Sequence, residues 1–394
     1  MKSILVVAPH LMLPTHMGHD IYIEKIARHL SCLSRFVDLV CCQAIRRYRN
    51  GEIESEVLYS NQMRGKIFAC IRTLFLRTHY LHERIITPSV LRVIQNQVEK
   101  EAYGIVLASY LVTLVCLLNS GKKFAVFTHN DEFKMYMDIA QQSANPLVHL
   151  VAKQSLGWLR REISRLAQVS VFLHISSNDR DGYERALPGH KCLITGVGTD
   201  LDESPQWGSA PLDAPVILSF VGSLGVQMAV DALNNFYIHF YPQLHSAFGP
   251  RLKVRIVGSQ PGTAIQKLCQ TAGWELHKDV SDFVLSQLLC ESTFTILPFS
   301  YSNGVKLKLL RSLGSGTPFL STTVSRPPNF ATPLGCCFSD NVEDWTAAIR
   351  FWLSQPDRFA MRQRLYDQAK ANSWPRIVDR LANALFVSLR DSVS

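Results

Sequence analysis

The sequence predicts an α/β protein built from two Rossmann-like domains, and three observations support this. The chain of 394 residues exceeds one typical hydrophobic core and suits two domains of nearly equal size. Near its start, an apolar strand at residues 4–8 is followed by a loop and a helix over 20–33, which is how a Rossmann-like domain begins. Residues 296–322 then read as strand, loop, helix, glycine turn and strand, the pattern of a parallel βαβ crossover.

Composition narrows the class of partner. With 47% hydrophobic and 19% charged residues, the chain has the make-up of a compact globular protein. Its net charge of +9 suits anionic partners such as nucleotides or phospholipids. Nucleic acid is not expected, because no basic cluster is interleaved with aromatic residues and no zinc-ligand spacing or helix-turn-helix signal occurs. The ten cysteines include no Cys-x-x-Cys and follow no signal peptide, so we expect reduced thiols in a cytoplasmic protein.

The first domain continues as an alternation of buried strands and helices. Apolar strands are predicted at residues 4–8, 37–41, 105–108, 124–127 and 171–175. The uncharged run from Tyr103 to Gly121 is long enough to raise the question of a membrane span. We interpret this run instead as part of an interior α/β layer, made of a buried strand, a helix cap at Ser109 and a short buried helix over 111–118.

A basic amphipathic helix is predicted between Leu58 and His82, a segment without acidic residues. At helical spacing one face carries Ile67, Cys70, Ile71, Leu74 and Phe75, and Lys66, Arg72 and Arg77 flank or oppose it. Two interpretations are equally open. The helix lies on an anionic lipid surface, which would place the protein at the inner face of a membrane, or it packs on the first sheet with its cations in water.

The domain boundary is predicted within residues 201–215, which are rich in proline, glycine and aspartate and have no periodicity. The first domain is then 1–200, the second 216–374, and a final helical segment occupies 375–394. A linker of this composition permits relative motion of the two domains.

Two positions after predicted strands suit ligand binding. Lys306 and Lys308 fall in the first turn of the helix after strand 296–298, where backbone N–H groups already favour an anion such as phosphate. His129 directly follows strand 124–127, on the crevice side of a parallel sheet. The alternatives are an ordinary βαβ unit without a ligand and a structural histidine.

The segment Asn303 to Thr322, NGVKLKLLRSLGSGTPFLST, resembles the donor segment of family 4 (group 1) glycosyltransferases. Its glycines, basic pair and Gly-x-Pro ending match, whereas Asn303 and Arg311 occupy positions where that family usually has glutamates. Similar strings are THNDE at 128–132 and FVGSL at 220–224. The resemblance implies the GT-B fold, in which two Rossmann-like domains flank a cleft and a C-terminal helix crosses back to the first domain.

The resemblance also implies site residues. His129 and Lys308 would be catalytic. The donor would contact Gly222, Ser223, Asn303, Gly304, Val305, Lys306, Lys308 and Arg311. The acceptor and sugar loop would include His16, Gly18, Asn130 and Glu132, although His16 and the neighbouring His19 are more simply explained as solvated loop residues.

The implied activity is transfer of a sugar, with retention, from a nucleotide-diphosphate sugar to a glycan, lipid-linked or other acceptor in polysaccharide or glycoconjugate biosynthesis. We expect a hexosyltransferase-type enzyme without cofactor or metal, because protein cations would neutralise the diphosphate. The alternative is a non-catalytic GT-B scaffold or nucleotide-sugar-binding subunit. Two features motivate this alternative. Arg311 and Asn303 replace the usual glutamates, and no Arg/Lys pair follows FVGSL, where only Gln227 is available.

Overall fold

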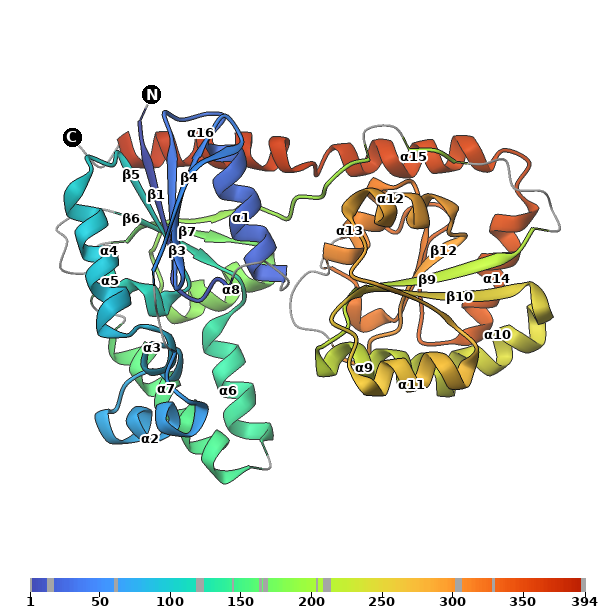
Figure 1. Cartoon of the computed structure of the whole chain (residues 1–394), viewed down its shortest axis with the longest axis horizontal. Helices are drawn as coiled ribbons and strands as arrows, with labels where there is room; N and C mark the ends of the chain where they lie inside the picture. The colour runs from blue at the N-terminus through green and yellow to red at the C-terminus, as the bar shows by residue number, and fades with distance from the viewer. Residues whose placement is uncertain are drawn as a thin grey trace. The chain divides into compact units, whose positions relative to one another are not determined.

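The computed structural model describes residues 2–12, 18–59, 63–117, 124–143, 145–162, 165, 169–202, 205–207, 214–301, 307–327 and 330–390. These form two compact units (Figure 1). Unit 1 comprises Met1–Val197 and Trp374–Ser394, and unit 2 comprises Gly198–Ser373. The division falls a few residues before the predicted linker, because the chain already bonds to unit 2 there: the Thr199 N–H donates to the Asn372 carbonyl at 2.9 Å.

Unit 1 is built on an eight-stranded sheet in the order β4-β3-β2-β1-β5-β6-β7-β8. The strands are β1 (Ile4–Ala8), β2 (Val37–Cys41), β3 (Ala44–Arg49), β4 (Glu52–Leu58), β5 (Ile105–Ser109), β6 (Phe124–Thr128), β7 (Val169–His174) and β8 (Cys192–Ile194). Pairing is parallel from β2 to β8, and β3 and β4 add an antiparallel hairpin at one edge. Every residue of β1, β2, β5 and β6 is buried, as expected for parallel strands covered on both faces.

The helical elements of unit 1 are α1 (Gly18–Leu30), α2 (Lys66–Leu76), α3 (Tyr80–Ile85), α4 (Pro88–Lys100), η1 (Leu111–Thr113), α5 (Leu114–Leu117), α6 (Glu132–Gln142), α7 (Pro146–Glu162), α8 (Ser177–Ala186) and α16 (Trp374–Arg390). The C-terminal helix α16 packs beside α1, where the Tyr22 and Trp374 rings lie 5.4 Å apart. The uncharged run after Tyr103 forms β5, η1 and α5. Among the described helices, none combines the length and apolarity that crossing a bilayer requires.

Unit 2 has a six-stranded parallel sheet in the order β11-β10-β9-β12-β13-β14. Its strands are β9 (Val216–Ser223), β10 (Leu252–Ser259), β11 (Glu275–Lys278), β12 (Phe294–Leu297), β13 (Phe319–Ser321) and β14 (Cys337–Phe338). Its helical elements are α9 (Gln227–Asn235), η3 (Phe236–Phe240), α10 (Tyr241–Phe248), η4 (Gly249–Arg251), α11 (Thr263–Ala272), α12 (Asp282–Glu291), α13 (Leu307–Gly314), η5 (Thr323–Ser325), α14 (Val342–Ser354) and α15 (Arg358–Lys370). Figure 1 shows α12 and α13 on one face of the sheet and α9, α10 and α11 on the other.

Both sheets therefore have the doubly wound arrangement that the sequence predicted, and the predicted α/β class with two Rossmann-like domains is confirmed. In each sheet the strand order reverses beside the first strand of the unit, between β1 and β5 in unit 1 and between β9 and β12 in unit 2. Ligands of such sheets bind at these reversals, outside the carboxyl ends of the strands.

The basic helix α2 does not pack on the sheet as one of the two interpretations required. It lies against α3 and α7, and it buries only Ala69 and Thr73. Its apolar side chains point outward instead, and Ile67 and Phe75 are 74% and 86% exposed. Arg72 is not a free surface cation, because its Nε donates to the buried carboxylate of Glu83 at 2.7 Å.

Candidate active site

Three of the donor-site residues predicted in unit 2 lie at the strand-order reversal of its sheet: Gly222, Ser223 and Lys308. Gly222 and Ser223 end β9 and are half-buried. Lys308 lies in the first turn of α13, and its Nζ is 4.9 Å from the centre of the Phe220 ring and 5.4 Å from that of Phe299. The ammonium is thus held over two aromatic faces at the carboxyl edge of the sheet.

Glycine at position 222 allows this approach. A Cβ built on Gly222 would lie 2.1 Å from Lys308 Nζ, so any side chain there would displace the ammonium. The neighbouring strand needs Gly258 for a similar reason, since a Cβ there would lie 1.7 Å from the Gly222 carbonyl oxygen. Bare backbone and a cation at one strand end are what a phosphate group requires.

A second cluster occupies the corresponding edge of unit 1. His129 directly follows β6 and is 5% exposed, and its Nε2 lies 2.8 Å from the Ser109 hydroxyl at the end of β5. The Tyr110 ring packs on His129 with centres 4.5 Å apart, and Tyr110 has a left-handed backbone, with φ of 66°. Non-glycine residues in this region are uncommon and concentrate at functional sites. Burial, aided by His19, lowers the pKa of His129 to about 3, so its imidazole is neutral at pH 7.

Two further histidines complete this edge. His10 lies two residues beyond β1, and its ring centre is 5.4 Å from that of His19 near the start of α1. The centres of the His10 and His19 rings lie 6.0 and 6.1 Å from the centre of the His129 ring. His10 was not predicted, although the signal that pointed to His129, a histidine just past a parallel strand, applies to it too.

Part of unit 2 is similar to a known protein family. Residues 215–355 match the family model described as glycosyl transferases group 1. This part of unit 2 is thus similar to group 1 glycosyltransferases. None of the curated proteins matches the sequence.

Solved structures show the fold of the whole chain. Sucrose-phosphate synthase from Thermosynechococcus elongatus superposes with a TM-score of 0.67 at 14% identity, covering 98% of this chain and 100% of that one. The α,α-trehalose 6-phosphate synthase from Burkholderia multivorans gives 0.62 at 12% identity, covering 100% of both. HepE from Anabaena, in complex with UDP and glucose, gives 0.60 at 10% identity, covering 98% and 100%. The fold is therefore GT-B, as the resemblance implied.

Within the matched segment, the guanidinium of Arg311 contacts three side chains of unit 2. Its Nη2 donates to Asp202 Oδ1 at 2.8 Å and to Ser286 Oγ at 2.6 Å, and its Nη1 reaches Ser315 Oγ at 3.2 Å. The guanidinium thus braces the first residues of unit 2 against α12 and α13. The predicted donor residues Asn303, Gly304, Val305 and Lys306 lie outside the described residues.

The acceptor-loop residues predicted in unit 1 separate into two sets. Gly18 is exposed at the start of α1 and Asn130 is half-buried beside His129, whereas His16 lies outside the described residues. Glu132 is fully buried and points inward, where its Oε1 accepts from the Leu111 N–H at 2.9 Å and the Tyr183 hydroxyl at 3.2 Å. Burial raises its pKa to about 7. These contacts give Glu132 a structural role: it holds the loop in place, and its side chain does not face a ligand.

Proposed function

We propose that this GT-B glycosyltransferase transfers a hexose, with retention, from a nucleotide-diphosphate sugar held by unit 2. The observation that carries the proposal is the placement of Lys308 against Gly222 at the reversal of the unit 2 sheet. A diphosphate leaving group gains negative charge as its bond to the sugar breaks. An ammonium already held beside backbone N–H groups stabilises that charge, and the protein need not reorganise during the reaction.

In this scheme the protein itself supplies the cation for the diphosphate, so the donor step uses neither a metal nor a cofactor. His129 is assigned to the sugar, because a neutral buried imidazole can donate or accept a hydrogen bond without carrying charge. Catalysis is then mostly positioning and electrostatic stabilisation. A uridine nucleotide is the first donor to test, since the superposable HepE structure contains UDP and glucose.

The proposed acceptor is a glycan or lipid-linked molecule at the inner face of a membrane, in polysaccharide or glycoconjugate biosynthesis. The exposed face of α2 supports it: Ile67, Phe68, Ile71 and Phe75 are all more than half exposed. Cations lie at both ends of this helix. Lys66 is exposed at its start, and the Arg161 guanidinium of α7 donates to the Arg77 carbonyl at its end. An apolar face bordered by cations suits anionic headgroups.

The donor proposal is tested by thermal shift with UDP, GDP, dTDP, ADP and CMP. A nucleoside diphosphate should raise the unfolding midpoint, since a ligand that binds only the folded state stabilises it. Release of nucleoside diphosphate from the matching nucleotide sugar then separates an enzyme from a binding subunit. Failure of every nucleotide to shift the midpoint would contradict the proposal, and binding without turnover would favour the non-catalytic alternative.

A further inference from the structure

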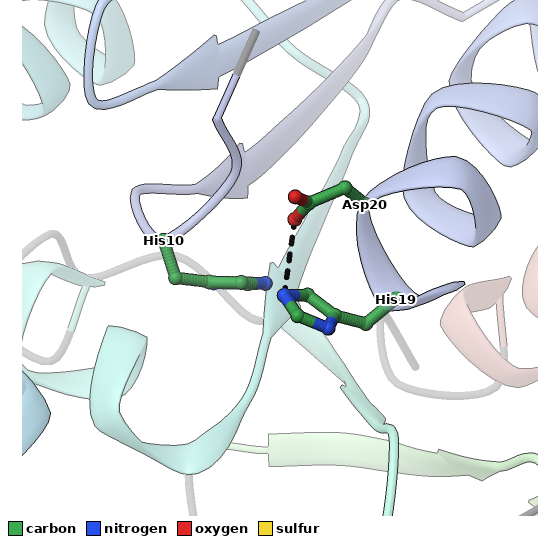
Figure 2. Close-up of side chains that lie close together, drawn as sticks. All are labelled: His10, His19 and Asp20. Atoms are coloured by element: carbon green, nitrogen blue, oxygen red, sulfur yellow. Dashed lines mark ion pairs between the residues drawn. The ribbon is translucent and has the colours of Figure 1, made fainter. Parts of the chain in front are cut away.

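Three side chains at the edge of the unit 1 sheet converge on one point. His10 comes from the loop after β1, and His19 and Asp20 come from the first turn of α1. Figure 2 shows the two imidazoles and the carboxylate pointing toward one another. One ring nitrogen of each histidine and one Asp20 oxygen all lie within 4.8 Å of one another.

One oxygen of the Asp20 carboxylate has no hydrogen-bond partner among the described residues. The residue is 2% exposed, and its Oδ1 makes no hydrogen bond although it is buried. The Nε2 of His19 lies 3.1 Å from this Oδ1, in a geometry that is not a hydrogen bond. A buried carboxylate needs a compensating cation or hydrogen bonds. The Nδ1 of His10 is also buried without a partner.

We propose that His10, His19 and Asp20 bind a divalent transition-metal ion of the Zn²⁺ type. Imidazole nitrogens together with one carboxylate are ligands for such ions, whereas Mg²⁺ and Ca²⁺ prefer oxygen ligands alone. The ion would supply the positive charge that compensates the buried carboxylate of Asp20.

The geometry is close to that of a coordinated site. Metal–ligand bonds of about 2.0 Å in tetrahedral geometry place ligand atoms roughly 3.3 Å apart. The His19 and Asp20 ligand atoms are already 3.1 Å apart, and all three ligand atoms lie within 4.8 Å of one another. Three protein ligands leave at least one position for water, as in open rather than structural zinc sites.

This site departs from the expectation of no metal that came from the sequence, and it does not depend on the proposed function. The proposed donor cation is Lys308 of unit 2, whereas the three ligands belong to unit 1. Spacing could not reveal the site, because His10 and His19 are nine positions apart and only the tertiary structure shows that they lie together.

The test is metal binding by the full chain after dialysis against a chelator. We expect calorimetric titration to show one Zn²⁺ per chain, no binding of Mg²⁺, and a Zn²⁺-dependent rise in the unfolding midpoint. His19→Ala and the isosteric Asp20→Asn should each weaken Zn²⁺ binding by more than about 100-fold, since loss of a second-shell partner alone costs 10- to 100-fold. His239→Ala removes an exposed histidine of unit 2 and should leave binding unchanged.

Cobalt(II) distinguishes this site from the free cysteines, because nitrogen and oxygen ligands give different absorption bands from thiolates. Equal Zn²⁺ affinity of the wild type, Asp20→Asn and His19→Ala, or a cobalt spectrum with thiolate bands, would overturn the proposal. The absence of Zn²⁺ binding by the wild type would overturn it as well.

Discussion

Arg311 Nη2 donates to Asp202 Oδ1 across 2.8 Å, and the two residues are 109 positions apart in the chain. Asp202 is held further by Ser286, whose hydroxyl donates to the same Oδ1 at 2.5 Å, and by Tyr366, whose hydroxyl donates to the Asp202 carbonyl at 2.7 Å. The position where group 1 glycosyltransferases usually have a glutamate thus carries a cation that secures the segment where unit 2 begins.

Removing this ion pair should destabilise unit 2 without changing the donor site. Arg311→Ala and Asp202→Ala are each expected to lower the free energy of unfolding by about 1.5 to 3 kcal/mol, the range for hydrogen bonds to charged groups. A double-mutant cycle in urea measures their coupling. Arg364→Ala, an exposed arginine of α15, is the control. Weaker nucleotide binding by Arg311→Ala at unchanged stability would return Arg311 to the donor site.

Lys308→Ala should weaken nucleoside diphosphate binding by about 1.5 to 3 kcal/mol, because a charge-assisted contact to phosphate is lost. Gly222→Ala should weaken it too, since the added Cβ would occupy the place of the ammonium. In the Lys308→Ala background the Gly222 substitution should then have little further effect. Calorimetric titration of the four proteins checks this, and fully additive losses would mean that the two residues act separately.

His129→Ala should lower turnover far more than nucleotide affinity, because the proposal places this imidazole against the sugar. Steady-state kinetics with the nucleotide sugar and titration with the nucleoside diphosphate report the two quantities separately. Equal losses in both would place His129 on the nucleotide. A lower unfolding midpoint with normal turnover would make it structural, as its 2.8 Å contact with Ser109 also allows.

Ile71→Ser combined with Phe75→Ser should reduce sedimentation with anionic vesicles at least about tenfold, because two apolar side chains no longer enter the interface. The unfolding midpoint should hardly change, since these side chains are 55% and 86% exposed. Phe283→Ser on α12, which is 71% exposed, is the matched control in unit 2. A wild type that fails to sediment with such vesicles would rule out the membrane proposal.

Glu132→Gln should remove a pH dependence of stability. The folded-state pKa of Glu132 is raised to about 7 from an ordinary value of 4.5, so the folded protein binds this proton more tightly than the unfolded chain. That stabilisation is complete below about pH 4.5 and is lost as pH rises through 7. The wild type should therefore lose about 3 kcal/mol relative to Glu132→Gln across this window. Parallel pH profiles of unfolding would show that Glu132 ionises normally.

Local pattern alone was enough to locate the five central strands of unit 1, but not the edge strands β3, β4 and β8. Strand β6 and the turn after it are visible as an apolar run followed by a histidine, and α13 appears as a helix with a lysine in its first turn. Parallel strands end at a common edge, so position in the chain predicts that His129 and Lys308 lie at the ligand edges of their sheets. The charge and periodicity of α2 were likewise evident, because both are properties of consecutive residues.

Only the tertiary structure decided which partners these residues have. The helical pattern of α2 defines an apolar face, but whether another element covers that face depends on packing with α3 and α7. The ion pair of Arg311 with Asp202, 109 residues away, could not be predicted from the sequence around either residue. His10, His19 and Asp20 meet because two elements joined by a loop end at the same edge of the sheet. Such contacts depend on the path of the backbone between distant residues, which local sequence preferences do not encode.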